Sequence, residues 1–298
     1  MSGGEPCGLI PVFKPSGWTS FDVIAKLRGI LHMKRLGHAG TLDPMATGVL
    51  PVFVGKATKA CDILPDSDKA YEAGFKLGVT TDTQDMTGKV LSESDKPVTR
   101  EDIEIALCNF RGEIMQLPPM YSAVKVGGQR LYDLARQGKQ VEREPRKITV
   151  YEAELTEYDE ASREGKLFVS CSKGTYIRTV IHDLGQALGC GGAMTSLCRT
   201  AAAGFTLGDC LTMEQLSEMP LEAALRPLIT AFEGCTKVHL DDRCSAMYKN
   251  GVKLRCEQVG ISRSYKGEFC VIGSDSAFLG LAKVVQADGV IKAVRNFY

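Results

Sequence analysis

The sequence predicts an α+β protein with a small β-rich module at its C-terminal end. Apolar and polar residues alternate at 148–158 and 166–171, which indicates strands, whereas 177–188 has the apolar spacing of a helix. From about Thr236, short apolar segments alternate with glycine-containing turns, a pattern typical of β structure. The 298 residues are enough for one large domain, or for a medium and a small one.

Strands and helices alternate in the first part of the chain. Thr19 or Ser20 is a suitable N-cap for the first helix and Thr99 for the second, because a hydroxyl group can accept a hydrogen bond from the first turn. Asp102 stands where a full capping box would have Glu or Gln. The expected elements are a strand at 8–13, a helix at 21–31, a connector at 33–40, a strand at 49–54, a short helix at 57–64, a strand at 69–78, a polar loop at 80–88, a returning strand at 89–91 and a helix at 100–110.

The segment from 112 to 232 is less regular. Gly127 and Gly128 are expected to form a turn, and Gly174 precedes the helix at 177–188. No element is assigned to 193–199, which is apolar with a single charge. The other expected elements are an extended segment at 112–121, a strand and turn at 122–130, a helix at 131–137, strands at 148–158 and 166–171, and helices at 212–217 and 221–232.

The cysteines and histidines do not form a pattern that would bind a metal ion or build a disulfide framework. The eleven cysteines are odd in number and scattered without a Cys-x-x-Cys pair, and the four histidines contain no His-x-x-x-His pair. No apolar run reaches the roughly 18–20 residues of a membrane span. Met1–Cys7 lack the features of a signal peptide, so the cytoplasm is the expected compartment and no membrane is an expected partner.

The charged residues are distributed unevenly, although the chain carries no net charge. Residues 1–60, 122–147 and 236–298 each have four more basic than acidic side chains (7 and 3, 7 and 3, 10 and 6), whereas 61–121 and 148–235 each have six more acidic ones (12 and 6 in both). If the three basic segments converge in space, they form a surface that attracts a polyanion such as a nucleic acid. Chance clustering on solvated surfaces is the alternative, and charge alone does not decide between the two.

The segment from Gly37 to Leu50 has the composition of a stiff loop with a functional carboxylate. It contains three glycines, and Pro44 fixes its own backbone and pushes Asp43 out of the helical region. No Lys or Arg lies within five positions of Asp43. A turn with a solvated Asp would show the same local features, so the wider pattern has to decide.

Five ordered motifs supply that wider pattern. They are Lys14-Pro15-x-Gly17-x-Thr19-Ser20, Gly37-His38-x-Gly40-Thr41-Leu42-Asp43-Pro44-x-Ala46-x-Gly48-Val49-Leu50-Pro51, Lys69-x-Tyr71 with Leu77-Gly78, Pro118-Pro119-x-Tyr121-Ser122-Ala123-x-Lys125, and Gly174-Thr175-Tyr176-Ile177-Arg178. In this order they closely resemble the TruB family of bacterial tRNA pseudouridine synthases, which act on a uridine of the tRNA T-arm. The resemblance covers about residues 8–235, and the remainder resembles the small PUA-like domain of the same enzymes.

The resemblance implies a fold, a domain organisation and a partner. It implies an α+β catalytic domain at 1–235 built on a mixed, mostly antiparallel sheet, with an RNA-contacting insertion at about 100–147, and a PUA-like RNA-binding domain at 236–298. The implied partner is tRNA through its T-arm stem-loop, without a required protein partner, and the implied state is a monomer. The chain departs from the family at Met45, where Leu is common, and at Cys198, where a second basic residue is often found, which puts one phosphate contact in doubt.

The resemblance also gives roles to eight residues. Asp43 would be the catalytic carboxylate, Arg178 would pair with it, and Tyr71 would pack against the target base and take part in proton handling. His38 would help to displace the nucleotide from its stack. The implied substrate-binding residues are His38, Lys14, Lys69 and, lining the uracil pocket, Tyr176 and Leu197.

The chemistry of pseudouridine formation is compatible with these residues. Breaking the N1–C1′ bond, rotating the uracil and forming a C5–C1′ bond exchanges no electrons and adds no group, so no cofactor or metal is expected. The carboxylate of Asp43 could attack C1′ or remove the 2′ proton, and the sequence does not choose between these routes. A guanidinium stabilises an ionised carboxylate, so Asp43 and Arg178 are expected to meet in space. The target base would have to be flipped out of the folded T-loop.

Three alternatives stay open from the sequence. A tRNA-binding module without catalysis would have lost the carboxylate, which is present as Asp43. The archaeal and eukaryotic relatives that work in guide-RNA particles usually carry long basic extensions, which are not seen in this sequence. A hydrolase built on Asp43 and His38 would need an activated water or a Ser or Cys nucleophile, and no pattern indicates one.

Overall fold

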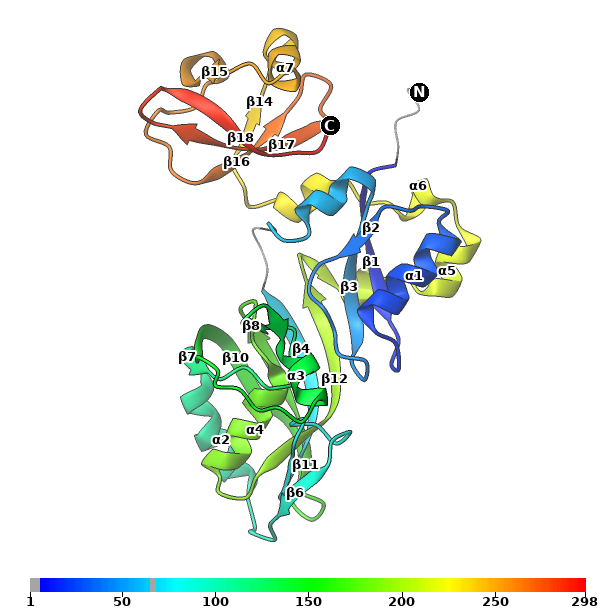
Figure 1. The fold of residues 1–298 in the computed structure, drawn as a ribbon, viewed down its shortest axis with the longest axis vertical. Coiled ribbons are helices and arrows are strands. Elements are labelled where there is room, and N and C mark those ends of the chain that lie inside the picture. Colours follow the sequence, from blue (N-terminus) through cyan, green and yellow to red (C-terminus); the bar gives the residue numbers. More distant parts are fainter. Residues whose placement is uncertain (1–5, 65–67) are drawn as a thin grey trace.

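The computed structural model describes residues 6–64 and 68–298. Residues 1–5, which belong to the segment interpreted above as lacking a signal peptide, and residues 65–67 lie outside this part. Two larger sheets organise the described residues, one of nine strands and one of five. The five-stranded sheet lies at one end of the molecule together with helix α7 (Asp242–Lys249) (Figure 1). None of the helices in the described part is long and apolar enough to cross a bilayer.

The nine-stranded sheet is mixed and mostly antiparallel, as the resemblance predicts. Along its main path the strands are β1 (Gly8–Lys14), β3 (Thr47–Val54), β12 (Gly192–Ala202), β4 (Lys69–Leu77), β11 (Glu164–Cys171), β10 (Arg146–Asp159) and β7 (Gly112–Gln116). Among the pairings in the described residues of this sheet, only that of β3 with β12 is parallel, with Cys198 opposite Thr47 and Arg199 opposite Gly48.

Strand β12 occupies the segment to which the sequence pattern assigns no element. It lies between β3 and β4, and its register against β4 shifts at Met194–Ser196 and again at Arg199–Ala201. Such shifts break the simple alternation of apolar and polar residues by which a strand is detected in a sequence. Figure 1 shows β12 as a long strand that connects the part of the sheet around β1 and β3 with the part around β4 and β11.

Helices α1 (Ser20–Ile30) and α2 (Arg100–Leu107) begin after the threonines that the sequence suggests. Thr19 and Thr99 each accept a hydrogen bond from the backbone N–H three residues later. The expectation of an incomplete capping box in α2 is wrong, because Thr99 N donates to the Asp102 carboxylate at 2.9 Å and so completes the box.

The other elements of this part are short, apart from helix α4, which packs on β12 and β4. They are β2 (Leu36–His38), a 3-10 helix at Gly55–Ala60, β5 (Val79–Thr81), β6 (Val90–Glu93), a 3-10 helix at Cys108–Phe110, β8 (Lys125–Val126), β9 (Gln129–Arg130), α3 (Leu131–Arg136), α4 (Ile177–Ala187), β13 (Phe205–Thr206), a 3-10 helix at Leu207–Asp209, α5 (Met213–Glu218), α6 (Leu221–Ala224) and a 3-10 helix at Leu228–Phe232. Strand β2 pairs with β3, so segment 33–40 is more than the expected connector. The helix expected at 57–64 is the shorter 3-10 helix that begins at Gly55.

The helix expected at 221–232 is interrupted. Pro227 disfavours helical backbone at Arg226. The N–H and C=O of Arg226 instead pair with Leu9, at 2.8 and 3.0 Å. Helix α6 therefore ends before this pairing, and a 3-10 helix begins after it.

The C-terminal part is β-rich, as predicted, and it shares apolar core with the large sheet. Its strands, in sheet order, are β14 (Lys237–His239), β16 (Glu268–Ile272), β17 (Phe278–Val285), β18 (Val290–Asn296) and β15 (Leu254–Arg255). Helix α7 is an addition that the turn pattern does not predict. Phe232 packs against Phe278 and Phe297, with ring centroids 5.2 and 6.4 Å apart. The same buried cluster includes Leu9 and Phe53 of the large sheet.

Candidate active site

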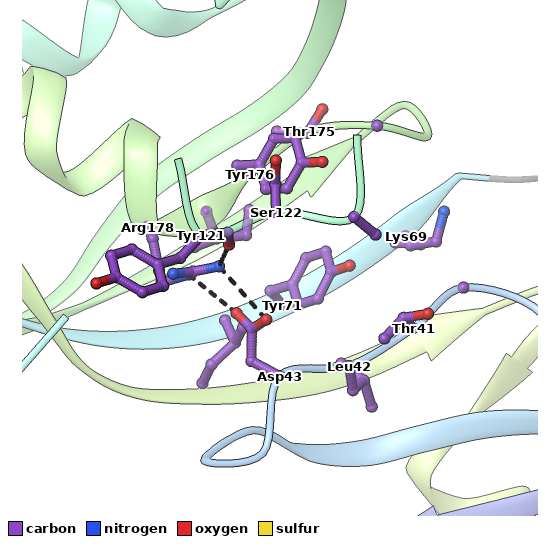
Figure 2. A pocket seen from close by; sticks show the side chains of 15 residues that line it. Thr41, Leu42, Asp43, Lys69, Tyr71, Tyr121, Ser122, Thr175, Tyr176 and Arg178 are labelled. Atoms are coloured by element: carbon purple, nitrogen blue, oxygen red, sulfur yellow. Dashed lines mark hydrogen bonds and ion pairs between the residues drawn. The ribbon is translucent and has the colours of Figure 1, made fainter. Parts of the chain in front are cut away.

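A cavity of about 260 Å³ lies where the large sheet meets the loop after β2 and the start of α4. Four of the five sequence motifs contribute to its lining, through residues 40–43, β4, 121–123 and 174–178. Figure 2 shows Arg178 on one side of the cavity and Lys69 and Thr41 on the other, with Tyr71 between them. Segments that are far apart in the chain therefore meet at one place.

The carboxylate of Asp43 is bound by the guanidinium of Arg178, as the sequence predicts. Oδ2 of Asp43 lies 2.9 Å from Nε, and Oδ1 lies 3.4 Å from Nη2 (Figure 2). The Arg178 side chain is 6% exposed, whereas that of Asp43 is 37% exposed. The carboxylate thus faces the cavity while the cation that orients it is buried, and a two-pronged contact fixes direction as well as distance.

Arg178 is itself held by main-chain carbonyl groups. It stands in the first turn of α4, where Nη1 donates to Thr83 O at 3.0 Å and Nη2 donates to Tyr121 O at 2.9 Å. These bonds join α4 to the loop after β5 and to the extended segment before β8. The guanidinium is consequently fixed before any ligand binds.

Asp85 is a second carboxylate on Arg178, and sequence reasoning missed it. Its Oδ2 lies 3.6 Å from Arg178 Nη1, and its side chain is 7% exposed. Thr83 Oγ1 and Thr87 N donate to Asp85 Oδ1 at 2.8 and 3.0 Å. The flanking threonines are the signal that could have found it, because short hydroxyl side chains on both sides satisfy a buried carboxylate locally.

Lys14 binds the backbone of the loop that carries Asp43 and does not line the cavity. It is fully buried, and its Nζ donates to the carbonyl groups of Ala46, Pro15 and Pro44 at 2.5, 2.9 and 3.2 Å. Burial lowers the pKa of Lys14 to about 8, although the nearby charge of Asp43 acts in the opposite direction. The structure therefore gives this lysine contacts with the protein backbone at the place where the motif suggested a substrate contact.

Arg199 is a further buried cation that the motifs did not single out. It is fully buried on β12, where Nε donates to Val49 O at 2.7 Å and Nη2 donates to Gly40 O at 3.0 Å. Gly40 has a φ of 70°, and a Cβ there would lie 3.1 Å from Arg199 Nη1, so the glycine allows the close approach. The sequence signal for Arg199 is a single charge in an apolar run. Its hydrogen bonds to backbone carbonyl groups explain how this charge can be buried.

Tyr71 and Leu197 belong to the apolar part of the cavity wall. Both side chains are 7% exposed and line the cavity. Tyr71 stands opposite Arg199 across the β4–β12 pair. Burial raises the pKa of the Tyr71 phenol to about 12, and this effect exceeds the opposing effect of Arg199. The phenol is therefore neutral near neutral pH.

Of the expected substrate-binding residues, Tyr176, Leu197 and Lys69 line the cavity, whereas His38 and Lys14 do not. His38 lies on β2, next to the loop of Asp43, and its Nδ1 is buried without a hydrogen-bond partner among the described residues. Burial, with a smaller contribution from Arg199, lowers the pKa of His38, so its imidazole is neutral near neutral pH. Burial also lowers the pKa of Lys69.

The arrangement suits chemistry by a single oriented carboxylate. Asp43 is the one carboxylate among the residues that line the cavity, and aromatic and apolar side chains surround the space next to it. In the part of the chain that the structure describes, no group of three or more His, Cys, Asp or Glu could hold a metal ion. A carboxylate in this position can act as a nucleophile or as a base.

Comparison with known proteins identifies the family. Residues 28–177 match the N-terminal domain model of the TruB family pseudouridylate synthase, and residues 178–235 match the C-terminal domain model of tRNA pseudouridylate synthase B. The chain belongs to the TruB family. This membership confirms the resemblance inferred from the five motifs.

TruB-family relatives cover nearly the whole chain. The tRNA pseudouridine synthase B of Clostridium tetani is 40% identical over 277 residues, which are 93% of this chain and 95% of the relative. The protein of the same name from Stutzerimonas stutzeri is 42% identical over 291 residues, 95% of this chain and 93% of the relative. Among solved structures, a chain of a Cbf5-Nop10-Gar1 complex is 27% identical with a TM-score of 0.76, covering 98% of this chain and 85% of that chain.

Proposed function

We propose that this TruB-family chain isomerises a uridine in the T-arm loop of tRNA to pseudouridine, with Asp43 as the catalytic carboxylate. The observation that carries the proposal is the contact of a cavity-facing Asp43 with a buried Arg178. The names of the curated relatives, at 40–42% identity, support tRNA as the substrate. Asp43 would either attack C1′ or remove the 2′ proton, and the arrangement is compatible with both routes.

Arg178 serves this reaction by orienting the carboxylate of Asp43. Its Nε and Nη2 contact both carboxylate oxygens, and its bonds to Thr83 O and Tyr121 O prevent it from turning away. A charge that is oriented in advance needs no rearrangement at the moment of reaction. The open side of Asp43 is left for the sugar of the target nucleotide.

Tyr71, Leu197 and Tyr176 would retain the uracil after its bond to the sugar is broken. A stack of a base on an aromatic ring is worth about 1–3 kcal/mol, which is enough to keep the detached base in place while it turns. The neutral phenol of Tyr71 can exchange a proton with the base through its hydroxyl group. Flipping the nucleotide costs a few kcal/mol, and His38, beside the cavity, would fill the position that the nucleotide leaves.

The surface around the cavity would bind the T-arm. We assign residues 1–235 to catalysis, 100–147 within them to an RNA-contacting insertion, and 236–298 to a PUA-like RNA-binding domain. The β8–β9 hairpin and α3 place Lys125, Arg130 and Arg136 around one open depression of the insertion. Lysine and arginine on such a surface bind phosphates, with an affinity that falls as salt rises. We propose that a monomer suffices.

A tritium-release assay tests the proposal. Formation of the C5–C1′ bond displaces the hydrogen at C5, so a tRNA transcript made with 5-tritiated uridine releases tritium when pseudouridine forms. We expect the wild-type chain to release it, and Asp43→Asn to bind the same tRNA without release. Asp95→Asn is the matched control, because Asp95 is fully exposed and lies outside the cavity lining.

Two outcomes would overturn the proposal. Normal turnover by Asp43→Asn would remove the assigned role of Asp43. A wild-type chain that binds tRNA but releases no tritium would favour the RNA-binding module instead. A transcript with cytidine in place of the T-loop uridine checks the position, since it should abolish release altogether.

A guide-dependent activity is the second candidate function. A chain in an H/ACA RNP bound to a substrate RNA aligns with 98% of this chain at a TM-score of 0.74. Its 26% identity is well below the 40–42% of the tRNA pseudouridine synthases, which favours direct action on tRNA. Turnover by the purified chain alone, with no other RNA or protein present, separates the two.

A further inference from the structure

Gln116, the last residue of β7, holds the main chain of Tyr176 at the start of α4. Tyr176 N donates to Gln116 Oε1 at 2.8 Å, and Gln116 Nε2 donates to Tyr176 O at 3.1 Å. Gln116 is 3% exposed and is absent from the cavity lining. The oxygen and the nitrogen of the buried Gln116 amide thus both bond to the backbone of Tyr176, and the two bonds together fix the position of that backbone.

Helix α4 depends on this contact because its N-terminus lacks a side-chain cap. Tyr176 occupies the N-cap position, and its own side chain makes no capping bond. Its carbonyl group accepts hydrogen bonds from Thr179 N and Val180 N within the helix, whereas its N–H points to Gln116. Gln116 therefore fixes the residue from which the helix starts, two positions before Arg178.

A second link joins the same two segments. Arg178 Nη2 donates to Tyr121 O at 2.9 Å, so residues 116–121 and 176–178 are connected at both ends. Pro118 and Pro119 lie between the two links, and their rings restrict the backbone there. The two short segments are therefore joined at two points, and one of these points is the guanidinium of Arg178, which also contacts Asp43.

We propose that Gln116 is a positioning residue for pseudouridine formation, which sets Arg178 against Asp43 and Tyr176 against the base. The inference rests on the proposed function and goes beyond it, because Gln116 touches neither the cavity nor Asp43. It also connects β7, which lies in the proposed RNA-contacting insertion, to the catalytic carboxylate through two hydrogen-bonded links.

Gln116→Met tests this role, because methionine has a similar size and lacks both polar groups. A displacement of about 1 Å among reacting groups costs on the order of 100-fold in rate, so we expect single-turnover tritium release to slow about 10- to 100-fold. The affinity for tRNA should stay within about threefold, since the lost bonds lie inside the protein. Gln186→Met, at an exposed glutamine of the same helix, is the matched control and should react at the wild-type rate.

Gln116→Glu gives a signature that a general loss of stability would not produce. An ionised carboxylate accepts the Tyr176 N–H but repels the Tyr176 carbonyl, whereas a protonated carboxyl group accepts and donates as the amide does. Burial raises the pKa of such a group, so the rate relative to wild type should rise as pH is lowered from about 8 to about 6. This measurement decides the matter even if the methionine variant does not fold.

The outcomes separate the two proposals. Wild-type rates in both variants, equal losses of rate and tRNA affinity, or a relative rate that does not change with pH would overturn the role of Gln116 while wild-type activity persists. Absence of tritium release by the wild-type chain would instead overturn the proposed function itself.

Discussion

At the scale of single residues, the buried cations of this site divide into two kinds. Lys14 and Arg199 donate to carbonyl groups of the chain around Asp43, so they shape the loop. Arg178 contacts two carboxylates, Asp43 and Asp85, as well as carbonyl groups. A basic residue in one of the sequence motifs is therefore not by itself a phosphate contact, and its burial decides between the two roles.

Replacing Asp85 by Asn tests the second carboxylate. The amide can still accept the bonds from Thr83 and Thr87, but the negative charge behind Arg178 is lost. Arg178 would then be held less firmly against Asp43, and we expect single-turnover tritium release to slow about tenfold with tRNA affinity preserved. Asp82→Asn, at an exposed position of the same loop, should be neutral. An unchanged rate in Asp85→Asn would show that Arg178 keeps its position through its other contacts and does not need Asp85.

The stability of the fold should depend on the charge of His38. Its pKa in the folded chain is lowered from 6.5 by burial, so the unfolded chain binds the proton more readily. The free energy of unfolding should therefore fall as pH drops through about 6.5, and fall less steeply in His38→Asn. Urea denaturation at a series of pH values measures both slopes. Equal slopes in wild type and His38→Asn would contradict a lowered pKa of His38 in the folded chain.

The sequence predicts part of the site and misses the rest for a physical reason. The Asp43–Arg178 contact follows from motifs whose residue types are needed for the chemistry. Asp85 and Arg199 are both buried, and their local sequence suggests burial. The groups that they contact, a side chain for Asp85 and backbone carbonyls for Arg199, are far away in the chain, so no motif predicts these contacts. Lys14 belongs to a motif, yet only the fold reveals that its ammonium group is turned into the protein.

At the scale of elements, the parallel pair of β3 and β12 brings the Asp43 loop to the strand that carries Leu197 and Arg199. The pairing is close: a Cβ on Gly48, whose φ is 105°, would lie 2.2 Å from Arg199 O. The unbroken apolar run at 49–54 predicts β3. Strand β12 is not predicted, because its register shifts twice and removes the alternation on which detection depends.

Gly48→Ala should therefore be much more damaging than Gly17→Ala. Both glycines have a positive φ, but nothing lies within 4 Å of a Cβ at Gly17. We expect Gly17→Ala to cost about 1 kcal/mol from backbone strain alone. Gly48→Ala adds a collision with backbone and should cost more than about 3 kcal/mol, or prevent folding. Denaturant titration of the two variants compares them, and similar losses would contradict the close approach.

At the scale of the whole molecule, the two sheets are joined by the cluster of Phe232, Phe278 and Phe297. The sequence shows a change of pattern near Thr236, and the structure confirms a β-rich part there. The sequence does not show that this part shares an apolar core with the large sheet. The three phenylalanines are far apart in the chain, and in the sequence they look like any other apolar residues.

Phe297→Ala should lower the stability of the entire chain. Phe297 is 5% exposed, and removing a buried phenyl ring costs about 3–5 kcal/mol. Because the cluster includes residues of both sheets, we expect wild type and variant each to unfold in a single calorimetric transition, shifted to lower temperature in the variant. Two separate transitions, with only one of them shifted, would show that the sheets unfold independently.

The order in which the strands are synthesised limits when the site can form. Arg199 is made 150 residues after Val49, whose carbonyl group it binds. A nascent chain that has not yet reached β12 carries the loop of Asp43 without Leu197, Arg199 or the strand that pairs with β3 in parallel. Contacts between such distant segments form late during translation. An unfinished chain on the ribosome should accordingly be unable to modify tRNA.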